Sequence, residues 1–255
     1  MPNQRRELIL EQLGLLPRWV PRHRARPATQ RVNAAAQLAP QTQARAETGD
    51  ERVARILRSG WVELKEMVRT CTDCPLHKAR RQSVFGVGDE SADWLFIGEG
   101  PGAEEDARGE PFVGQAGRLL DNMLAAIGLQ RGRNVYIANI VKCRPPGNRV
   151  PEPLEVGRCE PYLLRQIKLI APKLIVALGK TAASNLLHTD ASIGSLRGRL
   201  HEFQGTPLLV TYHPAYLLRN LADKAKAWED LCFGRDAMAK LKAGERLNAG
   251  QFAFN

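Results

Sequence analysis

The sequence contains no apolar run that approaches the ~18 to 20 residues needed by a membrane-spanning helix. Its first residues, Met1 to Arg6, are not followed by the unbroken apolar stretch of a secretory signal. No internal repeat is visible, and 255 residues are enough for one sizeable α/β domain with an appendage. We therefore expect a globular protein of the cytosol.

Lysine is absent from the first 60 residues, although the chain as a whole is basic. Those residues hold eleven arginines against five acidic residues, whereas the whole chain carries a net charge of +10. A basic chain suits a polyanionic partner, because neutralised phosphates release their counterions. Since much of the excess lies in the first 60 residues, DNA binding by the rest of the chain has to be argued from its motifs.

Four segments are predicted along the chain. Residues 1–22 form an amphipathic segment, and residues 23–50 form a flexible linker without hydrophobic periodicity. Residues 51–245 form the main domain, and residues 246–255 form a C-terminal tail. The fold class is therefore predicted from the pattern of strands and helices in residues 51–245.

Apolar strand-like runs alternate with amphipathic helical runs in the main domain. Strands are expected at 94–97, 135–140, 174–178 and 208–212. Helices are expected at 115–127, 153–170, 181–187 and about 223–242, and a helix-like pattern also runs from Asp50 to Cys71. Four buried strands separated by helices predict an α/β fold with a parallel sheet covered on both faces.

Polar and glycine-rich residues follow these strands, where ligands bind in such sheets. Gly98 to Gly102 follow the first strand, Asn139 ends the second, and His213 follows the fourth. The glycine-rich segment lacks the Lys-Ser/Thr of a phosphate-binding loop, which argues against an ATPase. Asn139 either caps a turn or reads a base edge, and Phe112 is either a core residue or a stacking platform.

Four of the five cysteines form two spaced pairs, Cys71 with Cys74 and Cys143 with Cys159. In a reducing cytosol they are not expected to form disulfides. Four thiolates are the usual ligands of an iron–sulfur cluster or a structural zinc ion. The long second spacing fits a zinc ribbon poorly, so the pattern favours a cluster, with zinc or unligated thiols as alternatives. Cys232, in the last helix, is interpreted as a packed thiol.

Three segments together resemble the iron–sulfur uracil-DNA glycosylases, family 4 of that superfamily. They read GEGPGAEEDARGEPFVGQAG (98–117), NIVKCRPPGNRVP (139–151) and HPAYLLRN (213–220). The resemblance spans about residues 65–245 and implies a three-layer αβα sandwich around a four-stranded parallel sheet. It also implies a 4Fe–4S cluster on the four cysteines and excision of uracil from DNA. The alternative is a non-catalytic iron–sulfur module that binds DNA.

The resemblance implies a role for each matching residue. Phe112 stacks on the extruded uracil, and Asn139 pairs with its edge, which cytosine would mismatch. Glu105 disfavours the methyl group of thymine, and the backbone around Glu99 and Gly100 lines the pocket. Together these residues would form a pocket specific for uracil.

The reaction implied is hydrolysis of the N-glycosidic bond. His213 donates a hydrogen bond to uracil O2, where negative charge develops. Better-known uracil glycosylases have a water-positioning aspartate where this chain has Gly100, so Glu99 is the nearest carboxylate and the group remains open. A related branch traps the sugar with a histidine, but residues 142–153 contain none, which favours simple hydrolysis.

Two further segments are assigned to partners. Leu217 or Leu218 would fill the space left by the extruded base, while Arg219 meets phosphate. Gln12 to Leu16 resemble the peptide with which bacterial repair proteins dock on the sliding clamp, the alternative being a helix that packs on the core. A monomer is expected.

Overall fold

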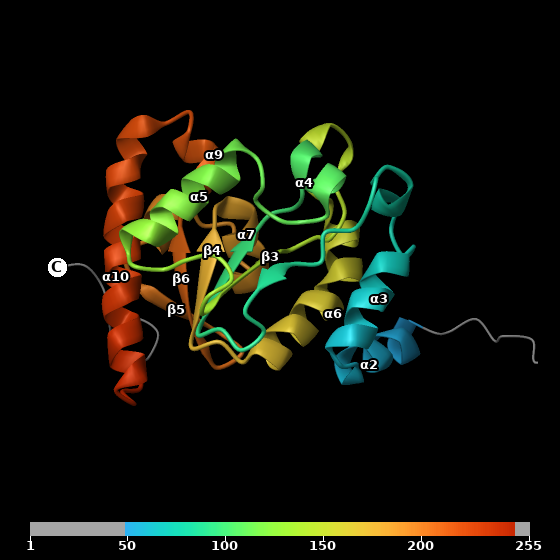
Figure 1. Ribbon diagram of the computed structural model, residues 1–255, viewed down its shortest axis with the longest axis horizontal. Coiled ribbons are helices and arrows are strands. Elements are labelled where there is room, and N and C mark those ends of the chain that lie inside the picture. Colours follow the sequence, from blue (N-terminus) through green and yellow to red (C-terminus); the bar gives the residue numbers. More distant parts are fainter. Residues whose placement is uncertain (1–48, 248–255) are drawn as a thin grey trace, which may run out of the picture. The chain divides into compact units, whose positions relative to one another are not determined.

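The computed structural model describes residues 49–247, so the amphipathic segment and the clamp-like peptide lie outside the described residues. Figure 1 shows the elements within that range and labels many of them. The helices are α2 (Gly49–Arg58), α3 (Trp61–Thr70), η1 (Pro75–Lys78), α4 (Ala103–Arg108), α5 (Gln115–Ala126), η2 (Pro146–Asn148), α6 (Pro153–Ile170), α7 (Lys180–Leu187), α8 (Ile193–Leu196), α9 (Pro214–Leu217), η3 (Leu221–Asp223) and α10 (Lys224–Lys242). The strands are β1 (Val87–Gly88), β2 (Trp94–Gly98), β3 (Val135–Asn139), β4 (Leu174–Leu178), β5 (Leu200–Phe203) and β6 (Thr206–Thr211).

The strands of the described range form one six-stranded sheet in the order β1-β3-β2-β4-β6-β5. The central four, β3, β2, β4 and β6, are parallel, which confirms the predicted strands and their direction. The two outer strands, β1 and β5, are antiparallel to their neighbours and were not expected from the sequence. The sheet is therefore mixed, with a parallel centre and an antiparallel strand at each edge.

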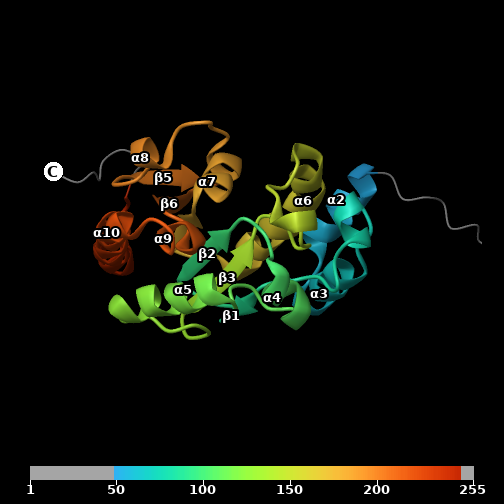
Figure 2. The ribbon, with the colours of Figure 1, turned by 90° about the horizontal axis from the view of Figure 1, so that it is seen from above.

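Helices cover both faces of the sheet, as the αβα prediction requires. Alternate side chains of each central strand point to opposite faces, so Leu95 and Ile97 join one core while Trp94 and Phe96 join the other. The first core is completed by side chains of α2, α3, α6 and α7, and the second by side chains of α5 and α10. Figure 2 shows α5 and α7 on opposite sides of the strands.

The long helix α6 begins where local chemistry favours a helix start. Pro153 occupies its first turn, where a missing N–H costs nothing. The Glu155 carboxylate accepts a hydrogen bond of 2.8 Å from the backbone N–H of Glu152. The predicted and observed bounds of this helix agree.

The helical pattern expected from Asp50 to Cys71 is divided into α2 and α3, which both contact α6. The division falls at Ser59 and Gly60, and the Ser59 hydroxyl donates a hydrogen bond to the carbonyl of Ile56. Such a side-chain bond competes with continuation of the helix. In the part of the chain that is described, no helix is both long enough and apolar enough to cross a membrane.

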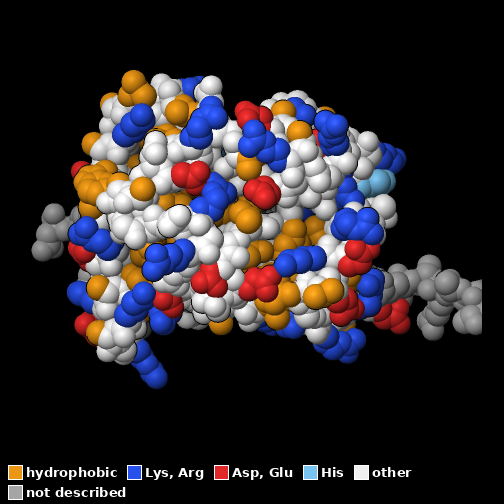
Figure 3. All heavy atoms as spheres, viewed as in Figure 1, with side chains coloured by type: hydrophobic (Ala, Val, Ile, Leu, Met, Phe, Trp, Pro, Cys, Tyr) orange, Lys and Arg blue, Asp and Glu red, His pale blue; other side chains and the backbone are white. Residues whose placement is uncertain are grey.

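The four parallel strands end at one edge of the sheet, and this edge carries Gly98, Asn139 and His213, which the sequence placed after three of the strands. Gly98 ends β2, Asn139 ends β3, Gly179 follows β4, and His213 lies two residues beyond β6. Lys and Arg side chains are spread over the face seen in Figure 3, among acidic and apolar groups. On that face the basic side chains do not gather in one patch.

Candidate active site

Phe112 and Asn139 meet above the end of β2. A methyl group placed on Gly98 would lie 2.6 Å from both the Phe112 ring and the Asn139 side-chain oxygen, so only glycine allows their approach. Asn139 is 2% exposed. Its Oδ1 is buried and accepts no hydrogen bond from the described residues. A buried acceptor without a partner is costly, which marks this atom as one that awaits a ligand.

The Phe112 ring is held by an unusual backbone conformation. Phe112 has φ of 55°, in the left-handed region that a bulky side chain rarely adopts. Arg131 fixes this turn by donating hydrogen bonds of 2.9 and 2.8 Å to the carbonyls of Pro111 and Phe112. Strain of this kind persists only where the surroundings enforce it, and it is typical of functional sites.

Glu105 supports the same turn from the other side. Its Oε1 accepts hydrogen bonds from the backbone N–H groups of Val113 and Gly114, at 3.0 and 3.1 Å. Its Oε2 accepts one of 3.1 Å from the N–H of Gly102. Both carboxylate oxygens are therefore engaged by the chain, and Glu105 ties the start of α4 to the loop that carries Phe112.

His213 faces the Phe112 ring, with the ring centroids 5.5 Å apart. Its Nδ1 accepts a hydrogen bond of 3.1 Å from the backbone N–H of Ala215, which leaves the proton on Nε2. Burial, helped by the positive charge of Arg219 and opposed by Glu105, lowers the His213 pKa to about 4. At neutral pH the ring is therefore uncharged, with an N–H directed away from the backbone.

Gly179 permits the close approach of β4 to His213. A methyl group there would lie 2.7 Å from the His213 Cβ, and the glycine has φ of 86°. Its N–H donates a hydrogen bond of 2.8 Å to the carbonyl of Thr211. The ends of β4 and β6 are thus fixed to each other next to the imidazole.

Glu99 and Gly100 follow β2, but they face different neighbours. The Glu99 carboxylate accepts a hydrogen bond from the Thr181 hydroxyl, at the first turn of α7. A methyl group on Gly100 would lie 2.8 Å from the Val141 side chain, so glycine is needed for this packing. The Glu99 side chain is therefore oriented by α7.

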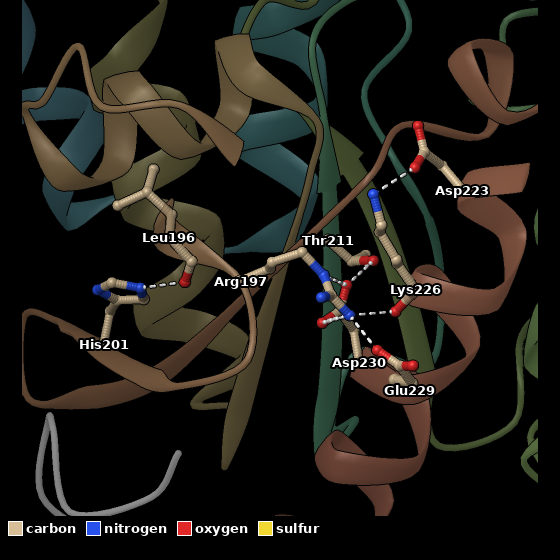
Figure 4. Close-up of polar contacts among 8 residues, drawn as sticks. All are labelled: Leu196, Arg197, His201, Thr211, Asp223, Lys226, Glu229 and Asp230. Carbon is tan, nitrogen blue, oxygen red and sulfur yellow. Dashed lines mark hydrogen bonds and ion pairs between the residues drawn. The ribbon is translucent and has the colours of Figure 1, made fainter. Parts of the chain in front are cut away.

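A buried carboxylate on α10 fixes the end of β6. Asp230 of α10 accepts a hydrogen bond of 2.8 Å from the Thr211 hydroxyl and pairs with Arg197 at 3.1 Å. Figure 4 shows Thr211 and Arg197 both directed at this carboxylate. Arg197 also donates a hydrogen bond of 2.6 Å to the carbonyl of Lys226. This network fixes the strand end two residues before His213.

The residues before Leu218 form a short helix, α9, which Pro214 begins. The helix turns Leu217 inward against α5, so Leu217 is only 1% exposed. The expectation that either leucine is free to enter DNA is therefore corrected, because Leu217 is part of the packed interior. Leu218 is 39% exposed, and Arg219 is exposed beside it.

The four cysteines expected as ligands line one small cavity, although they come from distant parts of the chain. Cys71 and Cys74 follow α3, Cys143 follows β3, and Cys159 lies in α6. Arg80 donates a hydrogen bond of 2.9 Å to the sulfur of Cys143. The backbone N–H of Lys142 donates one of 3.2 Å to the sulfur of Cys159.

Among residues 49–247 no group of three or more His, Cys, Asp or Glu side chains is already arranged around a metal position. A four-iron cluster takes one cysteine at each iron, so its ligand set is four cysteines. Four thiols around one cavity, with N–H donors to two sulfurs, fit the cluster.

The comparisons with known proteins agree with this geometry. Residues 85–232 match the family described as the Uracil DNA glycosylase superfamily. A type-4 uracil-DNA glycosylase of Archaeoglobus fulgidus is 46% identical over 159 residues, which cover 59% of this chain and 79% of that protein. The chain belongs to this family of glycosylases. The type-4 enzyme of Thermotoga maritima is also 46% identical, over 64% of this chain and 85% of its own, and that of Pyrobaculum aerophilum is 41% identical, over 66% and 90%.

Within this glycosylase, several supporting residues were not identified from the sequence. Arg131 holds the Phe112 turn, Thr181 orients Glu99, and Asp230 anchors Thr211. Each acts on a residue at least 19 positions away in the chain, so no short motif contains both partners. Thr181 lies shortly after the strand predicted at 174–178, and only this position indicated that it could lie near the site.

Proposed function

We propose that the protein removes uracil from DNA by hydrolysing the bond between the base and its sugar, which leaves an abasic site. One observation carries the proposal: a stacking ring, an unpaired buried acceptor and a neutral N–H donor converge at one edge of the sheet. They belong to Phe112, Asn139 and His213. The type-4 enzymes that are 41 to 46% identical to the chain support the same activity.

Asn139 recognises the uracil base. Its Oδ1 accepts the hydrogen of uracil N3, and its amide N–H group donates to O4. Cytosine presents an acceptor at N3 and a donor at the exocyclic amine, so both contacts would be mismatched. A site built on such bonds rejects the wrong base by ~10⁴ or more. Glu105, which braces the loop of Phe112, helps to keep the pocket too narrow for the methyl group of thymine.

Bond cleavage is assisted by His213. As the bond from sugar C1′ to uracil N1 breaks, the electron pair goes to the base and charge develops on O2. The Nε2–H group donates to that oxygen, and such a preorganised donor is worth ~3 to 4 kcal/mol of barrier. The Ala215 N–H holds the other ring nitrogen, which fixes the tautomer that can donate.

Water attack at C1′ completes the hydrolysis. Glu99 directly follows the last residue of β2, and Thr181 bonds to one of its oxygens. The other oxygen then accepts a hydrogen bond from the attacking water and aligns it with the sugar. The water adds to C1′, and the departing uracil anion takes up the proton that the water loses, which leaves free uracil and a sugar that is hydroxylated at C1′.

Extrusion of the base requires contacts outside the pocket. Unstacking a base costs roughly a few kcal/mol, and less for a mismatched uracil. Leu218, exposed at the end of α9, fills the vacated space, and Arg219 contacts a phosphate. The exposed apolar side chain beside an arginine supports this assignment.

A 4Fe–4S cluster bound by Cys71, Cys74, Cys143 and Cys159 would connect the segment after α3 to the loop after β3 and to α6. When bound, it supplies a rigid, negatively charged cross-link rather than a reacting group. The cysteines are free thiols, which suits the reducing cytosol, where we place the protein. Absorbance near 400 nm in the purified protein, lost together with iron, tests the cluster.

Release of free uracil from a single-uracil oligonucleotide is the decisive experiment. We expect an alkali-labile abasic site from the intact protein on uracil-containing DNA and none on the cytosine-containing control. A non-catalytic DNA-binding module would retain the oligonucleotide in a mobility-shift assay without any release. That result would refute the proposed activity.

The sliding-clamp interaction of Gln12 to Leu16 remains a separate proposal, since these residues lie outside the described range. A flexible tether would raise the effective concentration of the enzyme on DNA. Deletion of residues 1–22 should weaken clamp affinity in a pull-down or calorimetric assay, with uracil release from short oligonucleotides unchanged. Unaltered clamp affinity would remove the idea. We propose that the protein acts as a monomer.

A further inference from the structure

Lys142 is a charged residue in the interior, directly between the candidate uracil site and the cysteine cavity. It is 1% exposed, and its ammonium donates a hydrogen bond of 2.9 Å to the backbone carbonyl of Asn139. An ammonium group is rarely buried, because its transfer from water costs several kcal/mol unless it is paired. One neutral carbonyl does not compensate for that transfer.

The same residue also belongs to the cysteine cavity. Lys142 lines that cavity together with all four cysteines. Its backbone N–H donates to the sulfur of Cys159, and Cys143 is the next residue in the chain. Negative charge in the cavity can offset the remaining cost of burying the Lys142 ammonium, because metal-bound thiolates are anionic.

The carbonyl that Lys142 holds belongs to the residue assigned to uracil recognition. Asn139 is the last residue of β3, and beyond it the chain leaves the sheet. A bond to its carbonyl fixes the peptide plane from which the Asn139 side chain projects. A displacement of about 1 Å at such a position can cost ~10²-fold in rate.

We propose that Lys142 is a positioning residue that couples the occupied cysteine cavity to the uracil-reading amide. Its ammonium is held by the negative charge of the cavity and in turn holds Asn139 in place. This inference rests on the proposed function and on the proposed cluster. It assigns a catalytic consequence to the cysteine cavity without any electron transfer.

Replacement of the charge tests the coupling. Lys142→Met keeps the length of the side chain and removes its charge, whereas Lys142→Arg keeps a charge. Lys65→Met is the matched control, because Lys65 forms an exposed ion pair with Glu90 at 2.7 Å. For each holoprotein, the measurements are iron content, the reduction potential of the cluster, and kcat and KM on uracil-containing and cytosine-containing oligonucleotides.

We expect Lys142→Met to lower the reduction potential, because loss of a nearby positive charge disfavours an added electron. We also expect kcat/KM on uracil to fall by roughly 10- to 100-fold, with reduced discrimination against cytosine. Lys65→Met should match the wild type in every measurement. If Lys142→Met fails to retain iron, Lys142→Arg should retain it.

Two results would overturn the coupling. One is an unchanged potential together with unchanged discrimination in Lys142→Met. The other is equal loss of iron from the Met and Arg variants, since a purely steric role predicts that. If wild-type protein released no uracil, the proposed function would fail. The potential and the iron content would still report whether Lys142 senses the cavity.

Discussion

The neutral state of His213 predicts a specific loss of stability in acid. Its pKa is lowered from 6.5 to about 4 by burial and by Arg219. Between these pH values the unfolded chain binds a proton that the folded protein does not bind, so stability falls as the pH falls. The penalty is absent above about pH 6.5 and complete below about pH 4. From these two pKa values, the loss between pH 7 and pH 5 is about 2 kcal/mol.

Urea unfolding of the wild type and of His213→Asn at pH 7 and pH 5 measures this loss of folding stability. Other acid-labile contributions are common to both proteins, so the difference between them isolates the imidazole. The wild type should lose about 2 kcal/mol more than the variant. His188→Asn, which removes an exposed imidazole from the left-handed residue after α7, should behave as the wild type. Equal losses in the wild type and His213→Asn would refute the assignment of a buried neutral ring.

Three other changes test the supports of the site. Glu105→Gln should destabilise the protein by about 1 to 3 kcal/mol in urea unfolding and raise KM, because an amide cannot accept all three backbone bonds of the carboxylate. Thr211→Val should cost about 1 to 3 kcal/mol in the same assay, because Asp230 loses its hydroxyl donor. Arg219→Ala should reduce the slope of log Kd against log salt by about 1 with DNA, while leaving the stability unchanged.

The central fold is readable from the sequence because local signals and burial agree there. Each of the four parallel strands contains a continuous apolar run, as is typical of strands buried on both faces. The edge strands were missed for the opposite reason. β1 has two residues, and β5 has buried residues only at its ends, with His201 and Glu202 between them, so neither forms an apolar run.

Boundaries set by single side chains were harder to predict. The apolar period continues across Gly60, from Ile56 to Leu64, although the backbone turns between α2 and α3. Pro214 is a helix-start signal, but a four-residue helix is too short to produce a period. The helix α9 places the Leu217 side chain in the interior and leaves the Leu218 side chain exposed. The orientation of neighbouring apolar residues depended on tertiary packing.

The residues that face the pocket could be recognised from the sequence, whereas the charged residues that support them could not. The reason lies in the cost of burying a charge. Arg131, Lys142 and Asp230 each bond to the loop or strand end that carries one site residue. A charged residue in a sequence is ordinarily expected at the surface, because burial is costly. Here that cost is offset by polar groups near the sheet edge, which are backbone carbonyls for Arg131 and Lys142 and the Thr211 hydroxyl for Asp230. These charged residues can therefore alter specificity without touching the base, and their variants should change discrimination as well as stability.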